Sequence, residues 1–285
     1  MTFNFDAQSK KGCFADLHTH TTASDGLLTP SQLVMEALRV GLKAIGITDH
    51  DSTDGLNQAM EEGQRLGIQV IPGVELNTQV DDEEIHILGY YIHHDLPWFQ
   101  DMLETIRHSR WTRARKMVEN LRRMYNLNIS FEEVEQEVTD GAPGRPHIAR
   151  ALVKKGIVKD VAEAFEKYIG TDCPAYEPRY RLTLEEGIKA IKDAGGVPVL
   201  AHPGLLKDQK YTMMAIELGI QGIEAIHSKH TPEQCEYYSI LATKHGLVVT
   251  AGSDYHGEEG EDMPKLGDVK ICCSVIEQLK NLAKK

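Results

Sequence analysis

The sequence predicts an α/β fold in which a parallel barrel is interrupted by a block of helices. Short apolar runs alternate with segments of helical period in the first and the last third of the chain. The middle third carries helical pattern without buried strands. With 285 residues, the chain can form one large domain or a domain with an insert.

Seven apolar runs are expected to form strands. Each is short, and most are followed by a helical segment, as in the buried strands of parallel sheets. Such alternation over seven strands favours a parallel α/β barrel. The expected strands are residues 13–17, 43–48, 68–74, 84–91, 197–201, 222–226 and 247–251.

Capping signals mark the expected helices between these strands. Thr29-Pro30 combines an N-cap with a proline at the first helical position, and Gly41 ends that helix. The sequence from Thr183 to Glu186 is a capping box that begins another helix. Further helices are expected at about 54–66 and from 232 to about 246.

Residues 98–181 are expected to form a helical insert that acts as a substrate cap, and residues 1–97 and 182–285 are expected to form the barrel. The insert carries an arginine-rich stretch from Ile106 to Arg123. A charged helix face is usually solvated, and contact with an RNA strand is the alternative.

Composition restricts the partners of the chain. The formal net charge of −12 excludes a general basic surface for double-stranded nucleic acid or an anionic membrane. We find neither a signal peptide nor an apolar run of membrane-spanning length. The five cysteines are odd in number, two of them adjacent, which indicates a poor disulfide framework and favours a reducing cytoplasm.

Acids and histidines stand where the expected strands end. The carboxyl ends of barrel strands carry active sites, so these side chains are expected to meet. Because residues i and i+2 of an extended segment point the same way, His18 and His20 can reach one metal ion together. The set consists of His18, His20, Asp49, His50, Glu75, His202, Asp254 and His256, with His86 inside the fourth strand.

These side chains are more numerous than the ligands that one metal ion binds, and a carboxylate such as Glu75 can bridge two metal ions. We therefore expect a cluster of two or three divalent cations. Imidazole with carboxylate suits Zn, Mn or Fe better than Ca or Mg alone. One histidine at a strand end is more often a hydrogen-bonded polar residue, but the joint pattern indicates a metal site. Asp16 and Asp49 are expected to orient ligand histidines rather than to bind metal.

Six motifs resemble those of the PHP (polymerase and histidinol phosphatase) family and skip the insert. The resemblance implies a distorted seven-stranded barrel, (β/α)7, with a trinuclear metal centre. The motifs are Asp16-Leu17-His18-Thr19-His20, Ser24-Asp25-Gly26, Thr48-Asp49-His50, Gly73-Val74-Glu75, Ala201-His202-Pro203 and Ser253-Asp254-Tyr255-His256.

Residue by residue, the resemblance implies three groups of ligands. Relatives often have histidine where Asp25 stands, and a carboxylate favours harder ions. We therefore expect Mn²⁺, with Zn²⁺ or Fe²⁺ as alternatives. The groups are His18, His20, Glu75 and Asp254 for the first metal; Glu75, His86 and His202 for the second; and Asp25, His50 and His256 for the third.

The expected reaction is hydrolysis of a phosphate ester. A hydroxide that bridges two metals would attack phosphorus, with Glu75 as the bridging ligand. The leaving alkoxide would take a proton from His256 or His230, or be stabilised by the third metal.

The insert contains Gly144-Arg145-Pro146-His147, which is either a helix start with an exposed arginine or a phosphate contact. Similar runs occur in a stand-alone PHP subgroup with a helical insert. Those relatives remove the 3′-phosphate of nucleoside 3′,5′-bisphosphates, and some trim short RNA from the 5′ end. By this resemblance, Arg145 and His147 would bind a substrate phosphate. Lys229 or His230 would bind another, unless their loop is merely solvated.

Three other functions compete with this prediction. A histidinol-phosphate phosphatase would use the same metals, but the insert and the Gly-Arg-Pro-His run weigh against it. A metal-dependent C–N hydrolase would need a catalytic or carbamylated lysine, which none of the motifs supplies. A non-catalytic metal-binding module, as in degenerate PHP domains of polymerases, would have lost ligands that are all present here. The sequence does not set the oligomeric state.

Overall fold

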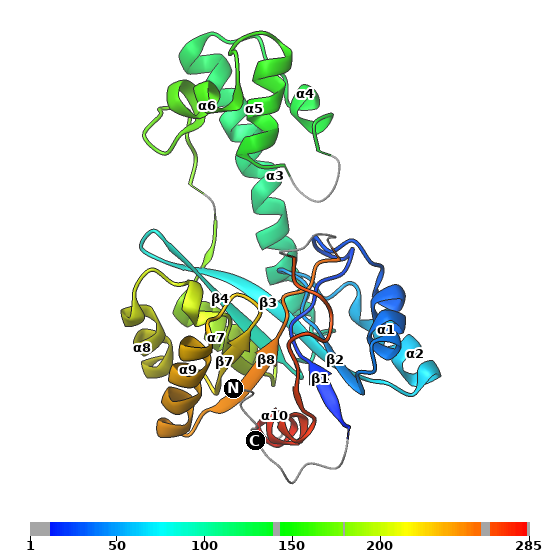
Figure 1. Cartoon of the computed structure of the whole chain (residues 1–285). Coiled ribbons are helices and arrows are strands. Elements are labelled where there is room, and N and C mark those ends of the chain that lie inside the picture. Colours follow the sequence, from blue (N-terminus) through cyan, green and yellow to red (C-terminus); the bar gives the residue numbers. More distant parts are fainter. Residues whose placement is uncertain (1–11, 139–142, 179, 258–262, 284–285) are drawn as a thin grey trace. The chain divides into compact units, whose positions relative to one another are not determined.

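The computed structural model describes residues 12–138, 143–178, 180–257 and 263–283 (Figure 1). The chain divides into two compact units. One unit combines the residues up to Gln100 with those from Leu182 onward, and the other is Asp101–Arg181. The role of the second unit as a substrate cap stays a prediction.

The first unit is built on one mixed sheet, and each of the seven expected strands coincides with a strand of this sheet. The strand order is β8-β7-β6-β4-β3-β2-β1-β9, and β5 pairs with β3. The strands are β1 Phe14–Asp16, β2 Ala44–Ile47, β3 Gln69–Val80, β4 Glu83–Tyr90, β5 Leu182–Thr183, β6 Val197–Leu200, β7 Gly222–His227, β8 Val248–Gly252 and β9 Ile271–Cys272.

The sheet curves into a nearly closed barrel, because the segment that follows β1 bonds to β8 and to the segment after β8. The Leu17 amide donates to the Ala251 carbonyl at 3.1 Å, and the Asp254 amide donates to the His18 carbonyl at 2.9 Å. Interior residues such as Leu88 and Val199 pack with α10 (Ser274–Ala283) in one apolar core. This closure brings the end of β1 next to the end of β8.

The expectation of an all-parallel barrel is wrong at β4. This strand runs antiparallel to both β3 and β6. The reason is the length of β3, which continues to Val80 and leaves only Asp81 and Asp82 before β4. A two-residue connection permits only an antiparallel hairpin. Asp81 has a φ of 51°, and two-residue hairpin turns require a positive φ at their first residue.

Helices cover the outside of this sheet (Figure 1). The expected capping box forms at Thr183 with Glu186, and the expected N-cap Thr29 forms a further capping box with Gln32. A third such box begins α9 at Thr231. The helices of this unit are α1 Pro30–Arg39, α2 Leu56–Leu66, α7 Leu184–Asp193, the short 3₁₀ helix η2 Pro203–Leu205, α8 Gln209–Glu217, α9 Pro232–Lys244 and α10.

The second unit is helical and has its own apolar core, in which Leu121, Ile148 and Leu152 are fully buried. None of the helices in the described residues is long and apolar enough to cross a membrane. The helices are α3 Pro97–Tyr125, whose first turn belongs to the other unit, α4 Phe131–Glu135, α5 Arg145–Lys154, α6 Val161–Ala164 and the π-helix η1 Phe165–Ile169.

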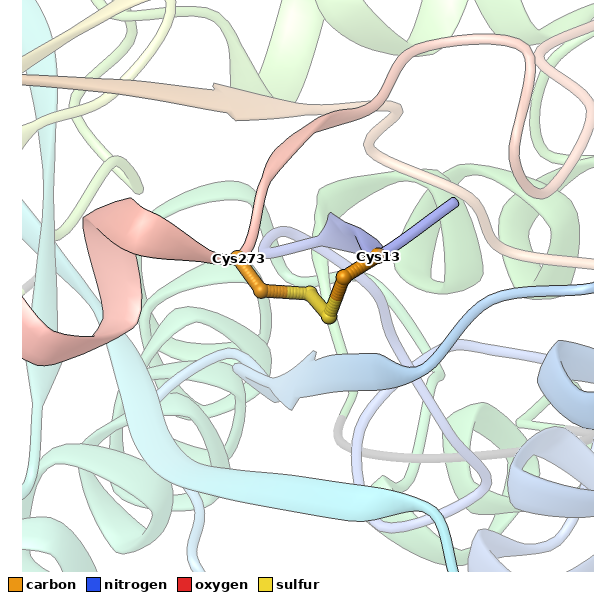
Figure 2. Close-up of a disulfide and its surroundings, with 2 residues drawn as sticks. All are labelled: Cys13 and Cys273. Atoms are coloured by element: carbon orange, nitrogen blue, oxygen red, sulfur yellow. A yellow bond between two sulfur atoms is a disulfide. The ribbon is translucent and has the colours of Figure 1, made fainter. Parts of the chain in front are cut away.

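A disulfide joins Cys13 to Cys273, so the expectation of a poor disulfide framework is wrong for this pair (Figure 2). Cysteine spacing cannot reveal a pair separated by 260 positions. The pairing of β1 with β9 brings the two Cα atoms to 5.5 Å, and the Cys273 amide donates to the Cys13 carbonyl. The compartment expected from the cysteine pattern stays a prediction.

Candidate metal centre

Three histidines from two segments surround one oxygen of the buried Glu75 carboxylate. Oε2 lies 3.1 Å from Nε2 of His18, 3.3 Å from Nε2 of His20 and 3.0 Å from Nδ1 of His50. His18 and His20 follow β1, as expected. Glu75 instead lies inside β3, because that strand extends beyond Val74, where its end was expected.

The other oxygen of Glu75 faces two further histidines. Oε1 lies 2.9 Å from Nδ1 of His86, which is on β4, and 3.1 Å from Nε2 of His202, which follows β6. The Glu75 side chain is completely buried between these two sets of rings. Both oxygens of this carboxylate thus have imidazole nitrogens beside them.

Two aspartates complete the ring of donors. Asp254 Oδ1 lies 3.4 Å from Nε2 of His18 and 3.1 Å from Nε2 of His20. Asp25 is 56% exposed, and its Oδ1 lies 3.3 Å from Nε2 of His256. Asp25 therefore stands on the open side of the site.

Candidate ligand atoms gather into groups within 4.8 Å of one another. The first group coincides with the set implied for the first metal. The second joins His20 to the three residues implied for the third metal. The third contains Glu75 and His86, which were implied for the second metal, but has His50 in place of His202. His202 nevertheless contacts Glu75. These groups are His18, His20, Glu75 and Asp254; His20, Asp25, His50 and His256; and His50, Glu75 and His86. A fourth group, which the resemblance did not imply, is His18, Glu224 and His227.

Several of these atoms are buried without a hydrogen-bond partner: Nε2 of His18, both ring nitrogens of His20, Nδ1 of His50 and Oε2 of Glu75. Buried polar atoms in folded proteins are nearly always paired, since an unpaired one costs about 1–3 kcal/mol. Here the unpaired atoms face one another and are of the types that bind transition-metal ions. The residues therefore fit divalent cations.

The electrostatics of the site favour positive charge at its centre. Burial opposes ionisation of Glu75, but the rings of His50 and His18 hold the pKa of its carboxyl well below the usual range. Burial also lowers the pKa of His86, yet the carboxylates of Glu75 and Glu84 raise it to about 10. Burial is the main reason that the pKa of His50 falls to about 3. Carboxylates held ionised among buried rings attract cations.

Two site residues have unusual backbone conformations. His202 has a φ of 28° and Asp254 a φ of 58°, a region that non-glycine residues seldom occupy. Such strain costs on the order of 1–3 kcal/mol and persists where the surroundings enforce it. In both cases it aims the side chain toward the Glu75 carboxylate or its histidines.

Asp16 and Asp49 bond to the loops around the site rather than to the ligand rings. Asp16 Oδ1 accepts from the amides of Ser253 at 2.9 Å and His18 at 3.3 Å, and burial raises its pKa to about 6. Asp49 accepts from the Thr21 amide and the Ser24 hydroxyl, both at 2.7 Å. Asp49 thereby shapes the loop that carries Asp25.

The other expected site residues have different surroundings. Both ring nitrogens of His230 bond to backbone, accepting from the Gly204 amide and donating to the Ala225 carbonyl, each at 3.0 Å. This pairing leaves His230 no ring nitrogen for proton transfer or substrate. Lys229 is exposed. Arg145 and His147 begin α5 in the helical unit, and His147 Nδ1 accepts from the Gly144 amide at 2.9 Å.

Glu224 and His227 on β7 also lie beside the candidate ligands, and neither was predicted from the sequence. Glu224 is completely buried, and it accepts from Nδ1 of His18 at 3.0 Å. His227 is also buried, with Nε2 at 3.7 Å from Asp254 Oδ2. An acid inside an otherwise apolar strand was the available signal, because an isolated charge is rarely buried without a partner.

Replacing Gly252 with alanine is expected to disrupt the site. A Cβ at this position would overlap the Cβ of His18 and lie 2.5 Å from Glu224 Oε1. Overpacking of this kind costs about 1–3 kcal/mol of stability, and here it also displaces a candidate ligand. We expect loss of bound metal together with a lower melting temperature, measured by elemental analysis and thermal unfolding.

Gly63→Ala is the matched control for this substitution. Its new methyl group would lie 2.6 Å from Cγ2 of Val70, where α2 packs on the sheet. This variant should unfold at a changed temperature but keep its metal content. Equal metal content in the two variants would show that the crowding at Gly252 does not act through His18.

This chain is similar to a known protein family and to several characterised enzymes. The family model described as the PHP domain matches residues 16–172. A 5′-3′ exoribonuclease, Rnm, from Salmonella typhimurium is 35% identical over 85% of this chain and 84% of its own length. A 3′,5′-nucleoside bisphosphate phosphatase from Chromobacterium violaceum is 32% identical over 92% of this chain and 94% of its own.

Among solved structures, a candidate metal-dependent phosphoesterase from Bifidobacterium adolescentis superposes with a TM-score of 0.72. It is 31% identical, and the match covers 96% of this chain and 98% of that one. Family model, relatives and fold thus agree with the histidines and acids gathered around Glu75. The chain therefore belongs to the PHP domain family of metal-dependent phosphoesterases.

Proposed function

We propose that this protein removes the 3′-phosphate of nucleoside 3′,5′-bisphosphates, or trims short RNA from the 5′ end, with two or three divalent cations. The observation that carries the proposal is the buried Glu75 carboxylate, which has histidine nitrogens within 3.3 Å of both oxygens. The relatives named for nucleotide and RNA hydrolysis support the substrate class.

In this proposal, the residues of the metal centre have different roles. Glu75 would contribute one carboxylate oxygen to each of two cations, and His18, His20 and Asp254 would complete one of the two sites. Divalent cations bound there would supply an activated water and neutralise charge on the phosphoryl group. Asp25 and His256, on the open side, would hold a third cation or face the leaving group.

His256 is the better of the two expected proton donors. Its Nδ1 bonds to the Asp254 carbonyl at 2.9 Å, which leaves Nε2 directed toward Asp25. His230 has both ring nitrogens engaged with backbone, so we assign it to the fold of its own loop. The leaving alkoxide would therefore meet His256 or a cation beside Asp25.

The helical unit offers a contact for a second phosphate. The Arg145 guanidinium lies over the rings of Phe165 and Tyr176, at 5.3 and 5.6 Å from their centroids. Arg113 lies over the same Tyr176 ring, at 5.3 Å. Two guanidinium groups that share one aromatic ring make a site suited to an anion, since arginine pairs with phosphate through forked hydrogen bonds.

The test of the proposal is metal analysis of the purified protein, coupled to a screen of phosphate esters. The screen compares a nucleoside 3′,5′-bisphosphate, a short 5′-phosphorylated RNA and histidinol phosphate. We expect bound transition metal and turnover of the first two substrates. Preference for histidinol phosphate would replace the proposed substrate, and a protein that binds metal without hydrolysing any ester would overturn the proposal.

Arg145→Ala is expected to lower kcat/KM for a nucleoside 3′,5′-bisphosphate by ~10–100-fold, because a hydrogen bond to a charged group contributes about 1.5–3 kcal/mol. Hydrolysis of p-nitrophenyl phosphate, which has no second phosphate, should change little. Arg150→Ala on the same helix is the control, since that side chain is exposed and bonds to the Glu137 carbonyl. Equal losses on both substrates would exclude a role of Arg145 in recognising the second phosphate.

A further inference from the structure

We infer that Glu224 and His227 of β7 are positioning residues that hold His18, His202 and Asp254 in the geometry that binds metal. The inference rests on the proposed function and extends it. β7 supplies none of the nine residues implied as metal ligands. It is nevertheless the strand that carries two buried polar side chains beside them.

A β-bulge explains how both side chains reach the interior. In a regular strand, residues three positions apart point to opposite faces. The pairing of β7 with β8 shifts register between Glu224 and Ile226, which inserts one residue into β7. Glu224 and His227 can then face the same side, and bulges often re-aim side chains next to active sites.

Glu224 contacts ligands on both sides of the Glu75 bridge. Its Oε1 lies 3.0 Å from Nδ1 of His18, and its Oε2 accepts from the backbone amide of His202 at 2.8 Å. A proton on Nδ1 of His18 leaves the Nε2 lone pair directed at Glu75 and Asp254. A carboxylate behind a metal-binding histidine fixes its tautomer and increases its basicity.

His227 faces the carboxylate oxygen of Asp254 that is not directed at His18 and His20. Nδ1 of His227 accepts from the Lys229 amide at 3.2 Å, so the neutral ring carries its proton on Nε2. That nitrogen is buried without a hydrogen-bond partner and faces Asp254 Oδ2 at 3.7 Å. The N–H dipole stabilises this carboxylate oxygen, while Oδ1 faces His18 and His20.

The first test compares Glu224→Gln with Glu83→Gln in the full-length protein stripped of metal. Glu83 is a buried glutamate that bonds to Lys207 instead of to a candidate ligand. In Glu224→Gln, the amide must turn a donor toward either His18 Nδ1 or the His202 amide, and the negative charge is lost. We expect ~10–100-fold weaker Mn²⁺ binding by calorimetry, against no more than about twofold for Glu83→Gln.

The second test compares His227→Gln with His227→Leu. Glutamine can place an N–H near the position of Nε2, whereas leucine removes it. We expect glutamine to restore most of the Mn²⁺ affinity that leucine loses. The absorption spectrum of the Co²⁺-loaded protein should also change with leucine and return with glutamine, a response that a packing role alone would not produce.

The results of these two tests distinguish failure of this inference from failure of the proposed function. If wild-type protein binds Mn²⁺ and hydrolyses a nucleotide ester, but Glu224→Gln and His227→Leu bind as tightly as wild type, the inference is overturned alone. If wild type binds no metal, the proposed function fails. Should Glu224→Gln not fold, His227→Leu decides, because it keeps the Glu224 contacts.

Discussion

Glu75→Gln is expected to lower kcat/KM for a nucleoside bisphosphate by ~10³-fold or more. Stabilisation of transition-state charge by metal ions amounts to several kcal/mol, and each factor of ten in rate corresponds to about 1.4 kcal/mol. The amide that replaces Glu75 can offer one oxygen, but it cannot bridge two cations as an anion. Steady-state kinetics and the metal content of the same preparation measure the effect.

Glu83→Gln is the control for this change, since it alters a buried glutamate on the neighbouring strand without touching a histidine of the centre. Glu83→Gln should keep its metal and near wild-type kcat/KM. If Glu75→Gln retained normal turnover with a full complement of metal, the carboxylate would not be the bridge.

Removal of metal is expected to abolish activity and to lower the melting temperature. The unpaired buried atoms of His18, His20, His50 and Glu75 lose their partners when the cations leave. An ion present at ~100 times its Kd stabilises the native state by about 2.7 kcal/mol, which corresponds to a shift on the order of 5 °C or more. Activity and thermal unfolding before and after dialysis against a chelator measure both effects.

Readdition of single metals to the stripped protein provides the control. Activity and melting temperature should return together with Mn²⁺, Zn²⁺ or Fe²⁺, and Ca²⁺ should restore neither, because imidazole ligands suit transition metals. Full phosphatase activity in chelated protein that contains no metal would contradict a metal-dependent reaction.

The sequence was sufficient to locate seven of the nine described strands, all but β5 and β9, since apolar runs and capping signals are local. Features that depend on pairing with another strand could not be predicted in this way. The extent of β3 beyond Val74 depends on its pairing with β4, so the antiparallel hairpin and the position of Glu75 inside a strand were not predictable. The Cys13–Cys273 bond likewise depends on β9, a two-residue strand without a sequence signal of its own.

The candidate site followed from histidine and acid spacing because strand ends converge in a barrel. Glu224 and His227 escaped this reasoning for one physical reason. Their common orientation depends on a bulge between β7 and β8, and a bulge changes which residues share a face. The surroundings of His230 were not predictable either, because its two backbone hydrogen bonds arise from tertiary folding and cannot be read from the His-Ser-Lys-His sequence.

The bond between Cys13 and Cys273 turns most of the polypeptide into a covalent ring, since the two residues are 260 positions apart. A single backbone cut within residues 101–181 would therefore open the ring without releasing a fragment. The nicked chain would migrate as one species on a denaturing gel without reductant and as two with it. Both halves would stay tethered beside each other, with the His18 segment in one and the Asp254 segment in the other.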